Sequence, residues 1–112
     1  MNIFYSQIGE DILIYNNYIN KIKNDGTYIE IGASDGLAYS NTKFFNEKLG
    51  FKGILIEPVP ELFKELKENR PQDILINAAV DYEEGLSKFI GENTCSGLDK
   101  YLSIFFPIKF SI

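Results

Sequence analysis

The chain has 112 residues, a length that suits a single domain. Hydrophobic residues make up 45% of it and charged residues 24%, which is the composition of a folded protein and excludes disorder as its main state. There is no histidine and only one cysteine. Histidine-dependent catalytic pairs, histidine metal ligands, an intrachain disulfide and a multi-cysteine zinc site are therefore excluded.

The charge balance argues against nucleic acid as a partner. The chain has 11 basic and 16 acidic residues, a net charge of −5, whereas proteins that bind a duplex neutralise its phosphates with Lys and Arg. The basic residues Lys64, Lys67 and Arg70 recur at every third position among glutamates of a predicted helix. We interpret them as a solvent-exposed helix face.

No targeting or membrane-spanning segment is recognisable. The N-terminus lacks a basic segment followed by an apolar one. The apolar stretch 101–112 is interrupted by Pro107 and Lys109 and is shorter than the roughly 18 residues that a spanning helix needs. The sequence thus predicts a cytoplasmic protein without a membrane span.

The chain begins with a predicted helix that runs from a cap at Ser6 to about Asn24, where Asp25-Gly26 ends it. Its apolar residues recur at steps of four and three and should share one buried face: Ile8, Ile12, Tyr15, Ile19 and Ile22.

Three β-rich runs then alternate with two helices. The runs are 27–31, 53–56 and 73–77, and the helices extend from Ser40-Asn41-Thr42 to Leu49-Gly50 and from Pro60 to Asn69, before Pro71. This order predicts a parallel sheet with crossover helices. The second and third runs are continuously apolar, as expected of strands buried on both faces. A turn at 81–85 and a strand at 86–90 should follow.

The carboxyl ends of these strands form a candidate ligand site, because open parallel sheets bind ligands at that edge. Glu57 follows the second strand, 25 residues after Gly32, where a carboxylate can accept both hydroxyls of a ribose. A dinucleotide site is disfavoured, since Ser34 and Leu37 occupy the second and third glycine positions of G-x-G-x-x-G. No phosphate-binding loop is present either.

The sequence resembles class I S-adenosylmethionine-dependent methyltransferases, and more specifically the FkbM methyltransferase family. The resemblance covers about residues 5–90 and rests on seven segments: Ser6-Gln7-x-Gly9-Glu10-Asp11, Ile29-Glu30-Ile31-Gly32-Ala33-x-Asp35-Gly36, Ser40-Asn41-Thr42, Gly53-Ile54-Leu55-Ile56-Glu57-Pro58, Glu61-Leu62-Phe63, Asn69-Arg70-Pro71 and Asn77-Ala78-Ala79-Val80. It implies a Rossmann-like three-layer α/β/α fold with a mainly parallel sheet. It also implies S-adenosylmethionine as cofactor, with methyl transfer to an oxygen of a small-molecule or sugar- or lipid-linked acceptor.

The resemblance also implies roles for individual residues. Gly32 and Gly36 would let the methionine part of the cofactor pass close to the backbone, and Glu57 would bind the ribose. The remaining implied positions are Glu30 and Asp35 beside the methionine part, Asn77 and Ala78 near the adenine, and Ser6, Gln7, Glu10 and Asp11 close to the site.

Each of these residues also has a purely structural interpretation. The glycines could serve turns alone, Asp35 could form an Asx turn, and Glu10 and Asp11 could stabilise the first turn of a helix through its dipole. Glu57 could be an exposed carboxylate at a strand end. The core is expected to contain Phe44, Phe45 and Leu49. Cys95 is expected to be an inert thiol.

The catalytic residues stay unassigned. Methyl transfer from a sulfonium needs mainly in-line positioning, and without histidine a carboxylate, a tyrosine or a metal-bound water would have to accept a proton. The acidic motif that family members carry after a fourth strand is not found between Leu98 and Ile112.

We therefore expect one incomplete methyltransferase domain, the N-terminal half of the fold. It would consist of a helix at 1–26, a cofactor-binding core at 27–90 and a tail at 91–112. The alternative is an inactive remnant or interaction module that self-associates or binds a partner through the open sheet edge at 28–31.

Overall fold

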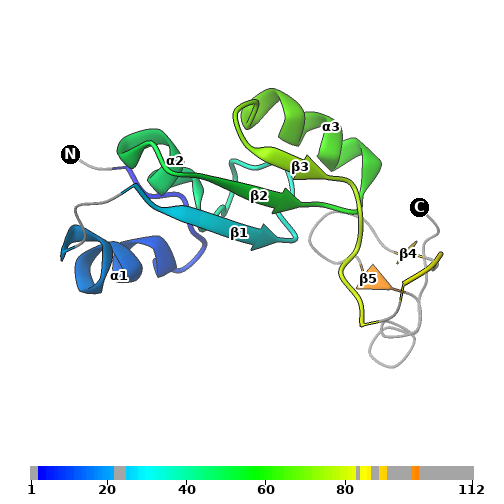
Figure 1. Ribbon diagram of the computed structural model, residues 1–112, viewed down its shortest axis with the longest axis horizontal. Coiled ribbons are helices and arrows are strands. Elements are labelled where there is room, and N and C mark those ends of the chain that lie inside the picture. The colour runs from blue at the N-terminus through cyan, green and yellow to red at the C-terminus, as the bar shows by residue number, and fades with distance from the viewer. Residues whose placement is uncertain (1–2, 22–24, 83, 87–88, 91–96, 99–112) are drawn as a thin grey trace.

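The structure, a computed structural model, describes residues 3–21, 25–82, 84–86, 89–90 and 97–98 (Figure 1). Its elements, in chain order, are α1 (Glu10–Asn17), the 3-10 turn η1 (Ile19–Lys21), β1 (Thr27–Ile31), α2 (Lys43–Leu49), β2 (Lys52–Ile56), α3 (Pro60–Asn69), β3 (Ile74–Ile76), β4 (Phe89–Ile90) and β5 (Gly97–Leu98). The predictions for Ile22 and Cys95 lie outside the described residues, as does the predicted tail 91–112 apart from residues 97–98.

The predicted parallel sheet is confirmed. Strands β1, β2 and β3 lie side by side in that order, all parallel, with Ile29 opposite Ile54 and Ile54 opposite Ile74. The fold class is therefore α/β, with helices α2 and α3 as the crossovers between successive strands. Within the described residues β1 has a neighbour on one side only, so its other edge is open, as predicted.

The ends of α2 and α3 follow from their sequences. Thr42 precedes α2, and Gly50 after it has φ 70°, a left-handed conformation that glycine adopts without strain. Pro60 occupies the first turn of α3, where its missing N–H costs nothing, and α3 ends at Asn69 before Pro71. Both helices were predicted at these positions.

The N-terminal helix is shorter than predicted at both ends. It begins only at Glu10, because Gly9 adopts a left-handed conformation (φ 92°), and it ends at Asn17, before the 3-10 turn η1. The Ser6 hydroxyl accepts a hydrogen bond from the Gly9 amide at 3.0 Å, so Ser6 stabilises the turn that precedes the helix. The predicted apolar face is wrong at Ile8 and Ile12, which are 84% and 39% exposed. Tyr15 and Ile19 do pack inward.

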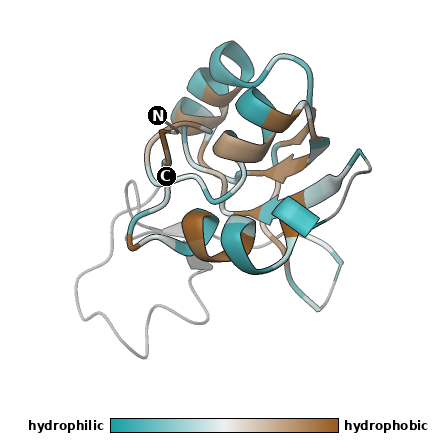
Figure 2. Ribbon diagram, turned by 90° about the vertical axis from the view of Figure 1, so that its left-hand side faces the viewer, coloured by the Kyte–Doolittle hydropathy of each residue, from teal (hydrophilic) through white to brown (hydrophobic). Residues whose placement is uncertain are grey.

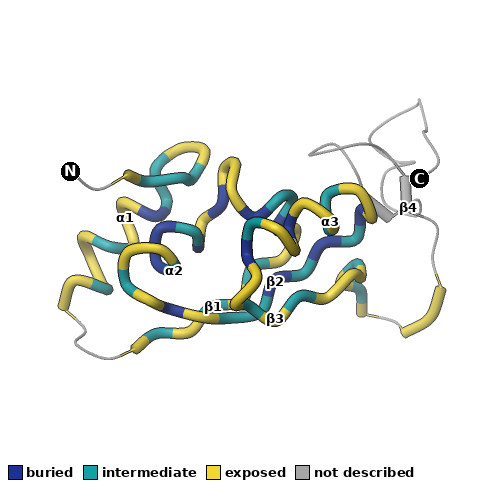
Figure 3. Tube along the Cα trace, turned by 90° about the horizontal axis from the view of Figure 1, so that it is seen from above, coloured by how far each residue is buried: buried dark blue, intermediate teal, exposed yellow. Residues whose placement is uncertain are grey.

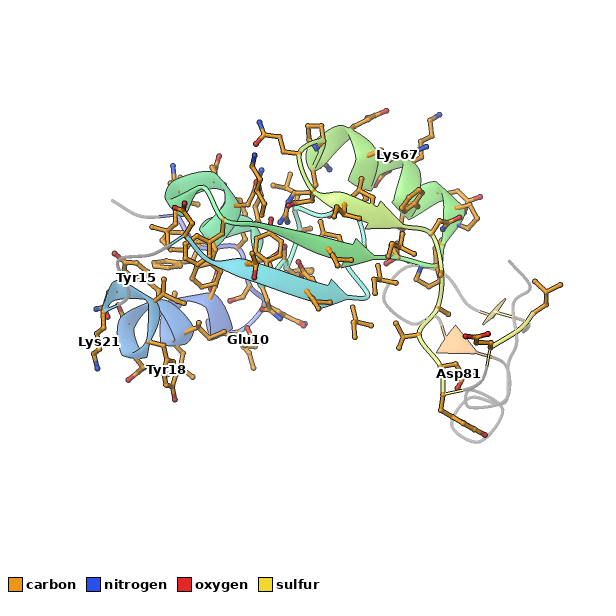
Figure 4. All side chains as sticks on the ribbon, in the orientation of Figure 1. Glu10, Tyr15, Tyr18, Lys21, Lys67 and Asp81 are labelled. Atoms are coloured by element: carbon orange, nitrogen blue, oxygen red, sulfur yellow. The ribbon has the colours of Figure 1, made fainter. Side chains whose placement is uncertain are left out.

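Two small cores hold the elements together. An aromatic cluster is built on the buried side chains of Phe44, Phe45 and Phe51, and Tyr15 of α1 contacts Phe44 edge-on at 5.2 Å between ring centroids (Figure 4). Phe44 and Phe45 are thus core residues, as predicted. The second core joins Ala33, Leu55 and Leu66, and so packs α3 onto β2.

One face of the sheet is bare in the described part of the chain, which contradicts the prediction of strands buried on both faces. The isoleucine face consists of Ile29, Ile31, Ile54, Ile56, Ile74 and Ile76, which the strand register places side by side. Ile29 and Ile74 are 67% and 64% exposed. Figure 2 shows the apolar strands, and in Figure 3 the labelled helices all lie on the opposite side of the sheet. A continuous apolar run shows that both faces suit burial, but the described helices cover one of them.

The predicted exposed basic face of α3 is confirmed for Lys64 and Lys67 but wrong for Arg70. Lys67 points away from the sheet (Figure 4), whereas Arg70 is 1% exposed. Arg70 lies just past the last helical residue, where the backbone leaves the helical conformation (φ −132°, ψ 54°). Helical spacing therefore no longer determines the direction of its side chain, which turns inward toward Tyr28 and Asp73.

Candidate functional site

The segment after β1, residues 32–39, forms what we call the glycine loop. Its backbone is left-handed at Gly32 (φ 74°), Ser34 (φ 54°), Gly36 (φ 77°) and Tyr39 (φ 59°). The amides of Gly32 and Ala33 both donate to the carbonyl oxygen of Ile56, at 2.8 and 3.0 Å. These bonds place the start of the loop at the carboxyl end of β2, the edge where α/β sheets bind ligands.

The two glycines of the loop differ in their surroundings. A Cβ on Gly36 would lie 2.4 Å from Cδ1 of Leu66 and 2.6 Å from Cγ of Arg70, so the close packing of α3 requires glycine there. A Cβ on Gly32 would meet nothing within 4 Å. The backbone of Gly32 therefore faces open space at the sheet edge, and this is the position where a ligand can approach it.

Glu57 links the glycine loop to the end of β2. Its side chain accepts hydrogen bonds from the Ser34 amide at 2.7 Å (Oε2) and from the Val59 amide at 2.9 Å (Oε1), and the residue is 4% exposed. Asn77, after β3, donates to the carbonyl oxygens of Glu57 and Pro58 at 2.8 and 3.1 Å. Each carboxylate oxygen of Glu57 retains a second lone pair that can accept a further donor.

The carboxylates of Glu30 and Asp35 both accept hydrogen bonds from the protein itself. Glu30 accepts hydrogen bonds from the Ser40 hydroxyl at 2.9 Å, the Asn41 amide at 3.0 Å and the Thr42 hydroxyl, and so fixes the start of α2. Asp35 accepts from the next amides of its own loop, those of residues 37 and 38, each at 2.9 Å. This is the Asx geometry that the structural interpretation of Asp35 anticipated.

The N-terminal segment lies beside the end of the glycine loop, since Ser6 forms a parallel bridge with Tyr39. Asp11 has a structural role there. Its buried carboxylate accepts hydrogen bonds from the Tyr5 amide at 2.7 Å and the Ser6 amide at 3.1 Å. Burial acts to raise the pKa of Asp11, but the hydrogen bonds from Ser6, Tyr5 and Ile12 outweigh it and hold the pKa below its ordinary value of 3.8.

The other predicted residues of this segment lie nearer the surface. The Glu10 carboxylate accepts a hydrogen bond from the Ile8 amide at 3.1 Å. Hydrogen bonds from its own backbone amide and, second, from the Ile8 amide lower the pKa of Glu10. Gln7 is exposed. Ala78 is likewise exposed, directly after Asn77. The structure thus brings Gly32, Glu57, Asn77 and Ala78 to one sheet edge, whereas the carboxylates of Glu30 and Asp35 point elsewhere.

Sequence reasoning used the Asn69-Arg70-Pro71 segment only for the family resemblance, placed Arg70 on an exposed helix face, and assigned neither Asn69 nor Arg70 to the site. In the structure Asn69 donates to the Asp35 carbonyl oxygen at 2.8 Å, and Arg70 donates to the Gly36 carbonyl oxygen at 3.0 Å. The segment was recognisable as a helix end. Its contact with a loop more than thirty residues earlier exists only in the folded chain.

The parallel sheet, with a glycine loop and a buried acidic residue at its carboxyl edge, defines an open α/β fold of the kind in which ligands bind at the carboxyl ends of the strands. The family model described as the methyltransferase FkbM domain matches residues 30–106, which is more than half of the chain. The chain belongs to this family. Methyl transfer is the general activity that membership supports.

Two further comparisons add no relative. Searches of the curated proteins and of the solved structures find no match to the chain. In the described part of the chain, no helix has both the length and the apolar character needed to cross a membrane.

Proposed function

We propose that the chain binds S-adenosylmethionine at the carboxyl edge of β1, β2 and β3, and that the methyl group goes to an oxygen of a small-molecule or a sugar- or lipid-linked acceptor. The observation that carries the proposal is the open space beside the left-handed backbone of Gly32, at the edge where Glu57 and Asn77 meet. Membership of the FkbM family supports the reaction class.

The residues at this edge fit such a molecule. Gly32 offers a backbone without a Cβ, and the remaining lone pairs of the Glu57 carboxylate can accept ribose hydroxyls in charge-assisted hydrogen bonds. Asn77 and Ala78 follow the neighbouring strand, on the side of Glu57 away from β1, which suits an adenine ring.

The chain's own contribution to methyl transfer is positioning. A sulfonium-bound methyl group reacts with a nucleophile that lies in line with the carbon–sulfur bond, so a rigid site accounts for much of the rate. Glu57 supports that rigidity, because one carboxylate holds both the glycine loop and the turn that leads into α3.

Gly32→Ala tests the proposal against a matched control. Gly50 has nearly the same backbone conformation (φ 70° against 74°), and a Cβ on it also meets nothing within 4 Å, but it lies at the end of α2 rather than at the site. Both substitutions should cost about 1–2 kcal/mol of stability, from the left-handed backbone alone. We expect Gly32→Ala to weaken S-adenosylmethionine binding at least about tenfold in titration calorimetry, and Gly50→Ala to leave it within about twofold.

Glu57→Gln adds a second arm: it keeps the shape of the side chain, removes its charge, and replaces one of the two oxygens that accept the Ser34 and Val59 amides with a donor. The expected loss is roughly 1.5–3 kcal/mol of binding free energy, or about tenfold to a hundredfold in affinity. Absence of binding by the wild-type chain, or equal effects of Gly32→Ala and Gly50→Ala, would refute the assignment of the site.

A further inference from the structure

Arg70 is the centre of a buried hydrogen-bond network at the end of α3. Its Nε donates to Asp73 at 3.0 Å, and neither side chain of this ion pair is exposed to solvent. Nη1 donates to the Gly36 carbonyl oxygen at 3.0 Å and to the Ser40 hydroxyl at 3.3 Å. Nη2 donates to the Tyr28 hydroxyl at 2.7 Å and to the Thr42 hydroxyl at 3.0 Å. Every N–H donor of the guanidinium thus has an acceptor.

Asn69, the residue before Arg70, binds the carbonyl group of the glycine loop that directly precedes the one bound by Arg70. Its side-chain amide donates to the Asp35 carbonyl oxygen at 2.8 Å, whereas Arg70 takes the Gly36 carbonyl oxygen at 3.0 Å. Two adjacent residues of α3's end therefore fix two consecutive carbonyl groups of the loop. The other hydrogen bonds of this stretch stay within the loop. The Gly36 amide donates to the Ala33 carbonyl oxygen, and the amides of residues 37 and 38 donate to the Asp35 carboxylate.

Arg70 also fixes the residues that directly follow the glycine loop. The Ser40 and Thr42 hydroxyls that accept from its guanidinium donate in turn to the Glu30 carboxylate. A charged side chain at the end of β1 and another at the end of α3 thus hold residues 40–42 between them. Both the turn at Gly36 and the exit of the loop depend on one guanidinium.

We infer that Asn69 and Arg70 are positioning residues of the cofactor site: they set the conformation of the glycine loop that presents Gly32 to the ligand. The inference rests on the proposed function, because the loop positions a cofactor only if the sheet edge binds one. Neither residue lies at the carboxyl edge, so each acts through the loop backbone. Lysine cannot replace Arg70, since it lacks the planar array of donors that reaches several acceptors together.

Asn69→Ala is the informative variant, because it removes the bond to Asp35 without leaving a buried charge. Asn46→Ala is its matched control: Asn46 makes the same kind of bond, from its side-chain amide to the Phe51 carbonyl oxygen at 3.0 Å, on α2 and outside the glycine loop. Both variants should lose similar stability. At a temperature where both are folded, we expect Asn69→Ala to weaken S-adenosylmethionine binding about threefold to tenfold and Asn46→Ala to leave it within about twofold.

The amide ¹⁵N shift of Gly36 gives a readout independent of binding, since this nitrogen shares its peptide group with the Asp35 carbonyl. We expect that shift to move in Asn69→Ala and to stay unchanged in Asn46→Ala. In Arg70→Lys the Leu37 amide, which shares its peptide group with the Gly36 carbonyl, should move in the same way. If Arg70→Lys does not fold, Asn69→Ala still decides the question.

The outcomes separate the two claims. No binding of S-adenosylmethionine by the wild-type chain would overturn the proposed function together with the site that the loop serves. Binding by the wild type that Asn69→Ala and Asn46→Ala weaken equally, or an unmoved Gly36 shift in Asn69→Ala, would overturn the positioning role alone.

Discussion

At the scale of single residues, the buried charges of this chain are stabilised by dense hydrogen bonding. Asp11 has no exposed surface and accepts bonds from the Tyr5 and Ser6 amides, the Ser6 hydroxyl and the Ile12 amide. A buried carboxylate without these donors would cost several kcal/mol. Asp11 thus holds the segment that precedes the left-handed turn at Gly9 against the start of α1.

Asp11→Asn should lower the free energy of unfolding by about 1–3 kcal/mol near pH 7, because an amide cannot accept all of the bonds that the carboxylate accepts. The folded pKa of Asp11 lies below 3.8, so its contribution is fully present above that value and is lost as the pH falls through the folded pKa. Urea denaturation between about pH 7 and pH 3 should show the wild-type advantage shrinking below pH 3.8. A constant difference across this range would contradict the role given to the carboxylate.

At the scale of the elements, the two faces of the sheet differ sharply in burial. Leu55 of β2 has no exposed surface, because α3 covers it through Leu66, whereas Ile29 on the isoleucine face is 67% exposed. Strand β1 alternates along its length between exposed and half-buried residues. Stability in the described part of the chain therefore comes from the helix-covered face.

Leu55→Ala should cost about 2–5 kcal/mol of stability, since it leaves a cavity under α3. Ile29→Thr keeps the branched side chain that strands favour and should cost less than about 1 kcal/mol. Chemical denaturation of both variants measures the contrast. An equally large loss in Ile29→Thr would mean that the isoleucine face is covered in solution.

The boundaries of most elements were predictable, because they fall at residues whose own backbone preferences begin or end a helix or strand. Gly26, Gly50, Pro60 and Pro71 are residues that end or begin elements through their own backbone preferences, and the structure has elements beginning or ending next to each. The apolar face of the first helix was less predictable. Whether Ile8 is buried depends on the left-handed turn at Gly9, and periodicity does not report that turn.

At the scale of the whole molecule, the Arg70 network joins segments that are distant in sequence. The Tyr28 hydroxyl of β1 donates to both Asp73 oxygens at 2.7 and 2.8 Å and accepts from Arg70, and Asp73 also accepts the Gly53 amide of β2 at 2.9 Å. The start of the sheet, the glycine loop and the end of α3 are thus connected through one set of polar groups.

The protein should lose stability in alkaline solution between about pH 10 and 12. Burial, followed by the hydrogen bond to Asp73, raises the pKa of Tyr28 from 10.0 to about 12. Because folding raises the pKa of Tyr28, its protonated hydroxyl stabilises the folded state fully below pH 10.0. This stabilisation is lost as the pH rises through the pKa of Tyr28 in the folded protein. Thermal unfolding of Tyr28→Phe should show a smaller decline over this range, while Tyr18→Phe, at a tyrosine that is 65% exposed, should behave as the wild type. Equal declines in both variants would exclude Tyr28 as the cause.

The amino-acid sequence by itself determined the parallel α/β order, the glycines and Glu57 at the strand ends, and the resemblance to the FkbM family that the match to residues 30–106 confirms. These features are local: periodicity, turn residues and strand ends are set by neighbours along the chain. Only the tertiary structure decided that Arg70 is buried, that Gly36 is required by packing while Gly32 faces open space, and that one sheet face is bare in the described residues. Each of these depends on contacts between segments far apart in sequence, and such contacts arise only when the chain has folded.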